Sequence, residues 1–434
     1  MHVRITPKIV ANKISGVTLA ASLCVALSAN PAFAGSIERI SVDSGNIQLN
    51  YTTFFSQALS DNGRYVVFNA NITGGPSGQF NTYLRDRATG ITELVSVAND
   101  GSADTRGGID VSNDGRYVVF LGKQLDGSTG YIDAYVRDRA TGTTELISIN
   151  SDGSPGTVNK SASEVSISGD GRYVVFVSNS PDIVNSDTNG VADVFVRDRV
   201  AGVTQRVSIA SDGTQANGNS GNGYRGTDIS ADGRYIVFSS SATNLTPNDA
   251  GLFVHDRIDG TTVGIYGPTN DNWFDLSSDG RHLVFSSSDS NLVANDSNGQ
   301  LDIFVHDLTM NTTELVSLAN DSSHSNGLSL YPGISANGRY VSFNSMATNL
   351  IASGNPQGLS TFVRDRIANT TEMVDVPHDG SVANNLSFGN SAVSGDGRYI
   401  VFASVASNLV AGDSDINTDW DIFIHDRISG QICP

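Results

Sequence analysis

Residues 168–176 read Ser-Gly-Asp-Gly-Arg-Tyr-Val-Val-Phe, and close variants of this stretch occur seven times in a chain of 434 residues. Each copy is followed by a polar stretch, by Phe-Val-Arg-Asp-Arg or a near variant, and in most copies by Thr-Gly-x-Thr-Glu-Leu-Val-Ser. The turn glycines are Gly63, Gly115, Gly171, Gly233, Gly280, Gly338 and Gly397. Repeats of this length that are rich in strand signals are typical of stacked supersecondary units.

One repeat contains four predicted strands. In the third repeat they are residues 164–168, 172–178, 193–199 and 204–209. The Asp-Gly pair between the first two is a strong hairpin signal, because glycine tolerates the positive φ of a tight turn. The second strand is apolar on both faces, so its sheet must be covered on both sides. Seven such sheets predict an all-β, seven-bladed β-propeller with four antiparallel strands per blade.

The two ends of the chain predict how the ring closes. The last repeat stops at residues 428–432, where its fourth strand should begin, and Ile37–Val42 matches Thr92–Val97 of the first repeat. We therefore expect the N-terminal segment to supply the fourth strand of the seventh blade and to cover an open sheet edge. Residues 35–434 are then one propeller domain.

Residues 1–34 have the pattern of a secretory signal peptide. A basic head with Arg4, Lys8 and Lys13 precedes a small, apolar stretch, and Ala32-Phe33-Ala34 fits a cleavage site. The sequence thus predicts a periplasmic or secreted protein. No later stretch is long and apolar enough for a membrane span, and Cys433 alone remains after cleavage, so no internal disulfide is expected.

Charge argues against some partners. Three of the 26 basic residues and none of the 45 acidic residues lie in the first 34, so the mature chain has a net charge of −22. Its arginines are spread over the repeats and form no single basic patch, which excludes nucleic acid and anionic membranes as favoured partners. We expect a monomer that binds a protein or a glycan.

The repeat resembles that of TolB-like β-propellers, which read Ser-Pro-Asp-Gly-Lys, an apolar strand, Asp-x-Tyr-Val and Arg-Arg-Leu-Thr. The matching stretches are residues 230–234, 302–305 and 206–208, and the likeness extends over all seven repeats. It implies a propeller fold and export. The turn proline of that family is absent from every repeat. Trp420-Asp421 is the one Trp-Asp pair, so the chain does not have a WD-repeat pattern.

Antiparallel strand order divides the loops between two faces. The turns between the first and second strands and between the third and fourth are short and share one face, the short-turn face. The other connections are long, vary between repeats, and share the long-loop face. Binding residues are commonly carried by variable loops on a rigid scaffold, so we expect function on the long-loop face and at the mouth of the central channel.

Three loops between the second and third strands share the spacing Asp-x-Asn-x-x-x-Asp. Their residues are Asp187, Asn189 and Asp193; Asp296, Asn298 and Asp302; and Asp415, Asn417 and Asp421. Hard cations such as calcium take several oxygen ligands from short loops of this kind. The alternative is a turn in which Asp and Asn side chains bond to their own backbone. The other four repeats lack the full Asp-x-Asn-x-x-x-Asp spacing, so the fold itself requires no cofactor. If these three loops bind an ion, we expect calcium.

Aromatic residues cluster near the starts of several first strands, which line the axis. They are Phe54, Phe55, Tyr224, Trp273, Tyr331 and Phe388. Packing between neighbouring blades explains most of them. Tyr224, Trp273 and Tyr331 are the candidates for stacking against a sugar or a peptide at the channel mouth.

Signals for catalysis are weak. The chain has no Gly-x-Ser-x-Gly, His-Glu-x-x-His or phosphate-binding loop. His324 and His378 lie in long loops and could act as general bases, and some polysaccharide lyases are seven-bladed propellers that use His and Tyr, which makes Tyr331 a possible partner for His324. The favoured interpretation is a non-catalytic protein- or glycan-binding scaffold, and a polysaccharide-degrading lyase is the alternative.

Overall fold

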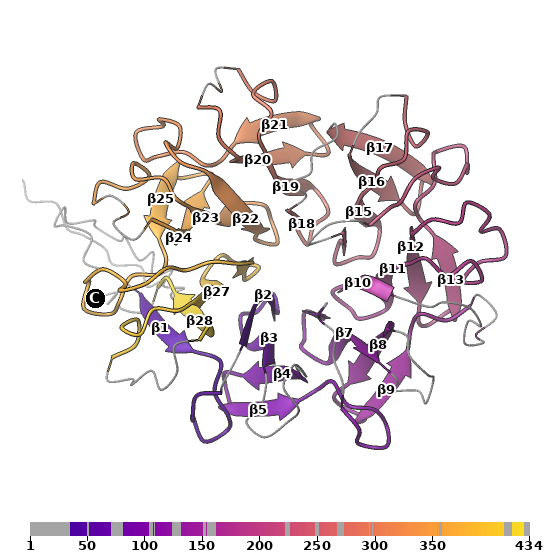
Figure 1. The fold of residues 1–434 in the computed structure, drawn as a ribbon, viewed down its shortest axis with the longest axis horizontal. Coiled ribbons are helices and arrows are strands. Elements are labelled where there is room, and N and C mark those ends of the chain that lie inside the picture. Colours follow the sequence, from indigo (N-terminus) through magenta and orange to yellow (C-terminus); the bar gives the residue numbers. More distant parts are fainter. Residues whose placement is uncertain are drawn as a thin grey trace, which may run out of the picture.

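The computed structural model describes residues 35–49, 52–70, 81–103, 107, 109–123, 132–150, 153, 162–221, 226–247, 251–266, 273–294, 296, 298–353, 355, 358–411 and 419–428. Within these ranges the strands form seven four-stranded antiparallel sheets, arranged as blades around a central axis (Figure 1). The predicted seven-bladed β-propeller is confirmed. Among the same residues, no helix has the length and apolarity to cross a membrane.

The blades follow the chain in order, each running from the axis outward. Blade 1 comprises β2 (Thr52–Leu59), β3 (Tyr65–Ala70), β4 (Asn81–Asp86) and β5 (Ile91–Leu94). Blade 2 comprises β6 (Ile109–Val111), β7 (Tyr117–Lys123), β8 (Ile132–Asp138) and β9 (Thr143–Leu146). Blade 3 comprises β10 (Ala162–Ile167), β11 (Tyr173–Ser178), β12 (Asp193–Asp198) and β13 (Val203–Arg206). Blade 4 comprises β14 (Thr227–Ile229), β15 (Tyr235–Ser239), β16 (Leu252–Asp256) and β17 (Thr261–Tyr266).

The remaining blades repeat this plan. Blade 5 comprises β18 (Phe274–Leu276), β19 (His282–Ser287), β20 (Asp302–Asp307) and β21 (Thr312–Leu315). Blade 6 comprises β22 (Ser329–Ile334), β23 (Tyr340–Ser345), β24 (Ser360–Asp365) and β25 (Thr370–Met373). Blade 7 comprises β26 (Ala392–Val393), β27 (Tyr399–Ser404), β28 (Asp421–Asp426) and β1 (Ser36–Arg39).

The N-terminal strand closes the ring as predicted. β1 pairs with β28 in antiparallel register, with Arg39 opposite Phe423 (Figure 1). Just beyond the strand, the Ile40 amide donates to the Ile422 carbonyl at 2.7 Å, and the Ile40 side chain is fully buried. The first and last segments of the domain therefore share one sheet, in which β1 covers the outer edge of β28.

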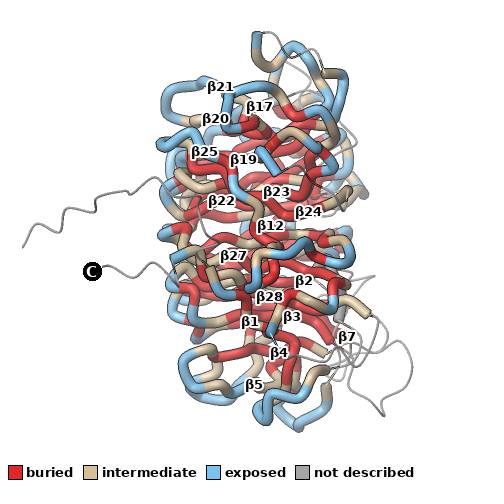
Figure 2. The backbone as a smooth tube through the Cα atoms, turned by 90° about the vertical axis from the view of Figure 1, so that its left-hand side faces the viewer, coloured by how far each residue is buried: buried red, intermediate tan, exposed pale blue. Residues whose placement is uncertain are grey.

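Burial comes from contacts between neighbouring blades. Seven apolar clusters are found among the described residues, and each joins side chains of two adjacent blades. In the cluster between blades 2 and 3, for example, Val119 and Val136 meet Val174 and Phe176. Seen from the side, the strands are accordingly mostly buried, and the exposed residues lie mainly in the loops (Figure 2). This explains why the second strands are apolar on both faces.

Each turn glycine packs on an aromatic ring of the preceding blade. Gly233 has φ +72°, and a Cβ placed there would lie 2.2 Å from Cδ2 of Tyr173. The same ring is covered by Arg257, whose guanidinium carbon lies 4.1 Å from the ring centroid. Gly63 meets Tyr399 of blade 7 in the same way, so this contact continues across the closure.

The fourth strands end earlier than the sequence suggests. In blade 3 the prediction reached residue 209, whereas β13 ends at Arg206. After Val207 the backbone turns, because the Ile209 amide donates to the Val207 carbonyl at 2.9 Å. The Ser208 hydroxyl at this turn donates to Asp193 at 2.5 Å. The chain then leaves the blade toward the next first strand.

Candidate functional site: the long-loop face

Four aromatic rings form a continuous arc on the long-loop face, near the axis. Trp273 precedes β18, Tyr331 lies in β22, Phe388 precedes β26 and Trp420 precedes β28, so the arc extends over blades 5, 6 and 7. The ring centroids are 4.5 Å apart for Trp273 and Tyr331, 4.9 Å for Tyr331 and Phe388, and 6.2 Å for Phe388 and Trp420. Aromatic pairs at these separations attract each other and hold one another in place.

A distorted backbone presents Tyr331 to its neighbours. Tyr331 has φ +54°, a conformation that non-glycine residues rarely adopt, and the β22–β23 register shifts between Leu330 and Gly333. Pro332 occupies this bulge, where its missing amide hydrogen costs no ladder bond. Tyr331 is buried between Trp273 and Phe388, whereas those two rings are partly exposed.

The predicted aromatic candidates thus have different outcomes. Trp273 and Tyr331 are brought into direct contact. Tyr224 lies outside the described residues, as do the side chains of Phe54 and Phe55. Trp420 is not among the candidates that the sequence pattern predicts, yet its ring extends the arc. Its Trp-Asp context gave no signal, because it precedes a third strand rather than a first strand.

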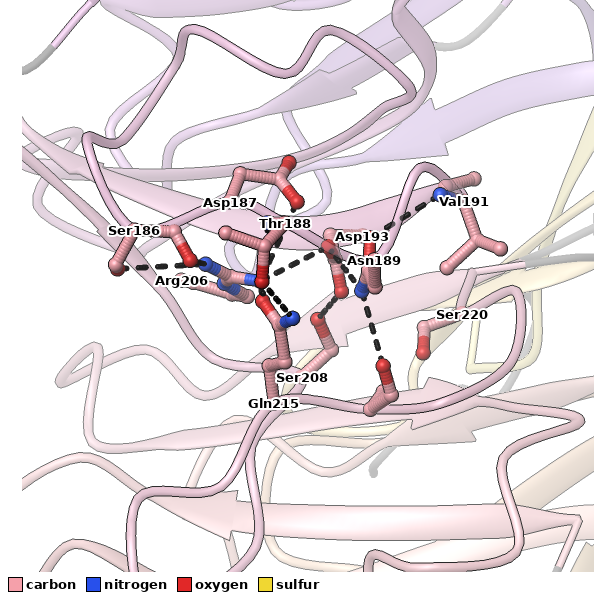
Figure 3. Close-up of polar contacts among 12 residues, drawn as sticks. Ser186, Asp187, Thr188, Asn189, Val191, Asp193, Arg206, Ser208, Gln215 and Ser220 are labelled. Atoms are coloured by element: carbon pink, nitrogen blue, oxygen red, sulfur yellow. Dashed lines mark hydrogen bonds and ion pairs between the residues drawn. The ribbon is translucent and has the colours of Figure 1, made fainter.

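The Asp-x-Asn-x-x-x-Asp loop of blade 3 is a network of side-chain hydrogen bonds (Figure 3). The Asn189 amide group donates to Asp193 Oδ2 and to the Ala216 carbonyl, both at 2.9 Å. Its Oδ1 accepts from the Val191 amide at 3.1 Å. Asn189 therefore caps the turn with its side-chain oxygen. This is the arrangement expected if the loop is a capped turn and not a metal site.

An arginine of the neighbouring strand enters this cluster. Arg206 Nη1 lies 3.3 Å from Asp193 Oδ2 and 3.6 Å from Asp187 Oδ1, and Nη2 donates to the Ser186 carbonyl at 2.8 Å (Figure 3). Gln215 accepts from the same guanidinium. The side chains of Arg206, Asp187 and Asp193 are 5%, 2% and 0% exposed. Blade 3 thus pairs its two buried carboxylates with a cation of its own.

Blade 7 has the corresponding pair. Arg39 of β1 lies opposite Phe423, as Arg206 lies opposite Phe195 in blade 3. Arg39 Nε is 3.7 Å from Asp421 Oδ2, which also accepts from Gln48 Nε2 at 2.7 Å. Asp415 and Asn417 of the predicted set lie outside the described residues.

Blade 5 keeps the loop but lacks the arginine. Asn298 donates to Asp302 Oδ2 at 2.6 Å, and its Oδ1 accepts from the Gln300 amide at 2.9 Å. Asp302 Oδ1 accepts from two hydroxyls, those of Ser317 at 2.6 Å and Ser325 at 2.9 Å. Burial raises the pKa of Asp302, and the negative charge of Asp296 acts in the same direction. Leu315 stands opposite Phe304, where blades 3 and 7 have arginine.

Calcium in these three loops remains a prediction. The described residues contain no cluster of three or more His, Cys, Asp or Glu side chains arranged to hold a metal ion. The asparagines use their oxygens on backbone amides in blades 3 and 5. Any cation in the described loops would therefore rely on the aspartates together with water or backbone oxygens.

The candidate histidines are not gathered into one site. His378 is exposed, and His324 is half-buried, with its backbone paired to Leu318. No hydrogen bond or ring contact joins His324 to Tyr331 in the described part of the chain; Tyr331 instead contacts Trp273 and Phe388. Of the histidines within the repeats, His255 is buried and lies 2.9 Å from Thr262 Oγ1, and burial lowers its pKa to about 4.

The short-turn end of the channel contains carboxylates that the sequence pattern did not single out. A cavity of about 100 Å³ is lined by Asp61, Asp110, Asp228 and Asp275, among others. The Ser166 hydroxyl is 2.9 Å from both Asp110 Oδ2 and Asp228 Oδ1. Burial and the charge of Asp228 raise the pKa of Asp110 to about 6. The Ser278 hydroxyl donates to Asp61 at 3.1 Å, which links blades 5 and 1 at this end.

Similarity to solved structures supports the propeller fold. No protein-family model and no curated protein matches the chain. An oligogalacturonate lyase from Vibrio parahaemolyticus is similar in structure, with a TM-score of 0.54 and 13% identity over 91% of this chain and 97% of that one. The β-propeller domain of the Trilobed protease from Pyrococcus furiosus gives 0.52 and 9% over 86% and 95%. TolB from Acinetobacter baumannii gives 0.40 and 16% over 65% and 63%.

Proposed function

We propose that this protein is an exported β-propeller that binds a glycan or a protein segment, without catalysis, through its long-loop face. The observation that carries this proposal is the arc Trp273–Tyr331–Phe388–Trp420 at the long-loop end of the axis. Ligand sites combine aromatic surface with a few polar groups held on a rigid scaffold. Here the rings are fixed by one another, and the neighbouring loops are rich in Asn, Asp and Ser.

The short-turn face is less suited to recognition, because its charged groups are already engaged in structure. Arg172 forms a bidentate pair with Asp198, at 3.0 and 2.7 Å. Arg199 covers Tyr117 of the preceding blade at 4.5 Å and pairs with Glu145 of that blade at 2.8 Å. These contacts recur around the ring and hold neighbouring blades together.

Two sequence features support export to the periplasm or the exterior. Residues 1–34 have the order of basic head, apolar stretch and small-residue cleavage site that secretion requires. The resemblance of the repeat to TolB-like propellers points the same way. With a mature net charge of −22, a neutral or basic ligand is favoured over an anionic one.

Tryptophan fluorescence provides a direct test, because Trp273 and Trp420 are the two tryptophans of the chain and both lie in the arc. Titration with a panel of neutral oligosaccharides and with periplasmic proteins should shift the emission for one of the two classes. Phe388→Leu should weaken that binding at least tenfold while both reporters remain. His378→Ala, an exposed control on the same face, should leave it unchanged.

A lyase is the second candidate, favoured by the similarity in fold to an oligogalacturonate lyase. In that case His324 would act as the base and Tyr331 as its partner. Eliminative cleavage produces an unsaturated sugar that absorbs in the ultraviolet, so the assay is direct. Tyr331→Phe separates the two candidates, since it keeps the ring for stacking and removes the hydroxyl. Activity abolished by His324→Ala and by Tyr331→Phe would replace the binding proposal with the enzymatic one.

A further inference from the structure

The loops of blades 3 and 5 correspond residue by residue through their hydrogen bonds. Asn189 bonds to Asp193 and to the carbonyl 27 residues later, and Asn298 does the same with Asp302 and Ser325. The serine hydroxyl 15 residues after each final aspartate donates to its Oδ1. Asp296 thus occupies the position of Asp187.

What differs is the positive charge. In blades 3 and 7 the residue opposite the central phenylalanine is arginine. Arg206 lies against both loop carboxylates of blade 3, and Arg39 lies against Asp421 of blade 7. In blade 5 the residue at this position is Leu315. In blade 3 both loop carboxylates are therefore paired with an arginine, and in blade 7 the final aspartate of the loop is. The fourth strand of blade 5 supplies no arginine.

A second side chain is exchanged at the same place. The residue bridged to the end of the fourth-strand segment is Gln215 in blade 3 and Gln48 in blade 7, and both amides contact the cluster. In blade 5 the bridged residue is His324. The loop of blade 5 thus has neither the guanidinium nor the side-chain amide that join the cluster in blades 3 and 7.

The Asp296 carboxylate of blade 5 has one oxygen without a hydrogen-bond partner in the described part of the chain. This oxygen, Oδ1, is buried. In blade 3 the corresponding oxygen, Asp187 Oδ1, also has no hydrogen bond, but it lies 3.6 Å from the positively charged Arg206 Nη1. Asp296 as a whole is partly exposed, but a buried carboxylate oxygen without a hydrogen bond or a nearby counter-charge is costly, and native proteins normally compensate it with a paired cation or a bound metal ion.

We infer that Asp296 and Asp302 in blade 5 together bind a hard divalent cation, which takes the place that Arg206 and Arg39 occupy in blades 3 and 7. Aspartate oxygens are the preferred ligands of calcium, and water or backbone oxygens complete its shell. With two carboxylates the affinity should be weak, with Kd about 10⁻⁴ to 10⁻³ M, as in other extracellular modules. Neither the aromatic arc nor the identity of the main ligand enters this inference.

Calorimetry and thermal unfolding of the full mature chain with CaCl₂ and with EDTA test it. We expect one calcium ion per chain and a rise in Tm of about 1 to 3 °C in 10 mM CaCl₂. Leu315→Arg should copy blades 3 and 7: it should abolish the calcium response and raise Tm in EDTA. Leu315→Met, which places the residue of blade 6 there, is the matched control and should retain the response.

Two further experiments test the individual ligands. Asp296→Asn should lose the calcium response without loss of folding, because it removes a charge that has no partner. Manganese tests the imidazole: stronger binding of Mn²⁺ that falls with His324→Gln would add His324 to the ligand set. Absence of heat and of a Tm shift with both ions, or a calcium response unchanged in Leu315→Arg, would overturn the inference.

Discussion

The short-turn face and the long-loop face of the ring differ in how closely their residues repeat from blade to blade. On the short-turn face, a glycine of every blade packs on an aromatic ring of the preceding blade, and in five blades an arginine covers that ring. On the long-loop face, equivalent positions differ from blade to blade, as Arg206 and Leu315 do. Repeated residues therefore maintain the spacing of the blades, and the residues that vary lie on the face that we propose binds a ligand.

The largest loss of stability is expected in blade 7, where the N-terminal strand closes the ring. Deletion of residues 35–43 removes β1 and the fully buried Ile40, and exposes the outer edge of β28. We expect Tm to fall by more than about 10 °C, or the protein to aggregate, because an open sheet edge recruits other chains. Differential scanning calorimetry with light scattering measures both. Removal of residues 1–34 alone is the control and should leave unfolding unchanged.

Turn glycines on the short-turn face provide a smaller effect with an internal control. Gly233→Ala places a methyl group 2.2 Å from the Tyr173 ring and forces a positive φ, so the free energy of unfolding should fall by about 3 kcal/mol. Gly260 has φ +65°, but a methyl group there would meet no atom within 4 Å, so Gly260→Ala should cost about 1 kcal/mol. Urea unfolding of both variants compares them. Equal losses would mean that the contact between blades contributes nothing.

Asp110, at the short-turn end of the channel, should show an inverted pH dependence. Asp110 has a folded pKa of about 6, raised by burial and by Asp228, above the unfolded value of about 4. Its contribution to stability is therefore full below pH 4 and is lost as the pH rises through 6. Asp110→Asn should stabilise the protein by about 1 to 2 kcal/mol at pH 7.5 and have little effect at pH 4.

Asp198 on the short-turn face is the contrasting case. Its hydrogen bonds to Arg172 lower its pKa to about 2, so its contribution is present above pH 4 and is lost as the pH falls through 2. Asp198→Asn should therefore destabilise at pH 7.5, where Asp110→Asn stabilises. Thermal unfolding of both variants across pH 3 to 8 would reveal the opposite signs, and parallel curves would contradict the assignment.

The smallest effect is expected on the long-loop face. His378 is exposed, so His378→Ala should change the free energy of unfolding by less than about 0.5 kcal/mol. Chemical denaturation is sensitive enough to check this limit. A large loss would show that variable loops also maintain the ring, and the contrast between the faces would weaken.

The number of blades, the strand order and the closure all follow from the amino-acid sequence, because they depend on local patterns that recur seven times. Residues 37–42 could be matched to residues 92–97 without coordinates. The apolar second strands likewise predicted burial on both faces. His282 stands at the tyrosine position of its repeat, and Gly338 packs on it as other turn glycines pack on tyrosine.

Contacts between side chains of different repeats, by contrast, emerge when the chain folds into a ring. Trp273 and Trp420 are far apart in the chain, and their shared arc exists because the ring brings blades 5, 6 and 7 side by side. The same holds for the pairing of Asp421 with Arg39, at opposite ends of the domain. Spacing along the chain predicts contacts within a blade, whereas contacts between blades depend on the curvature of the closed ring, which no single repeat encodes.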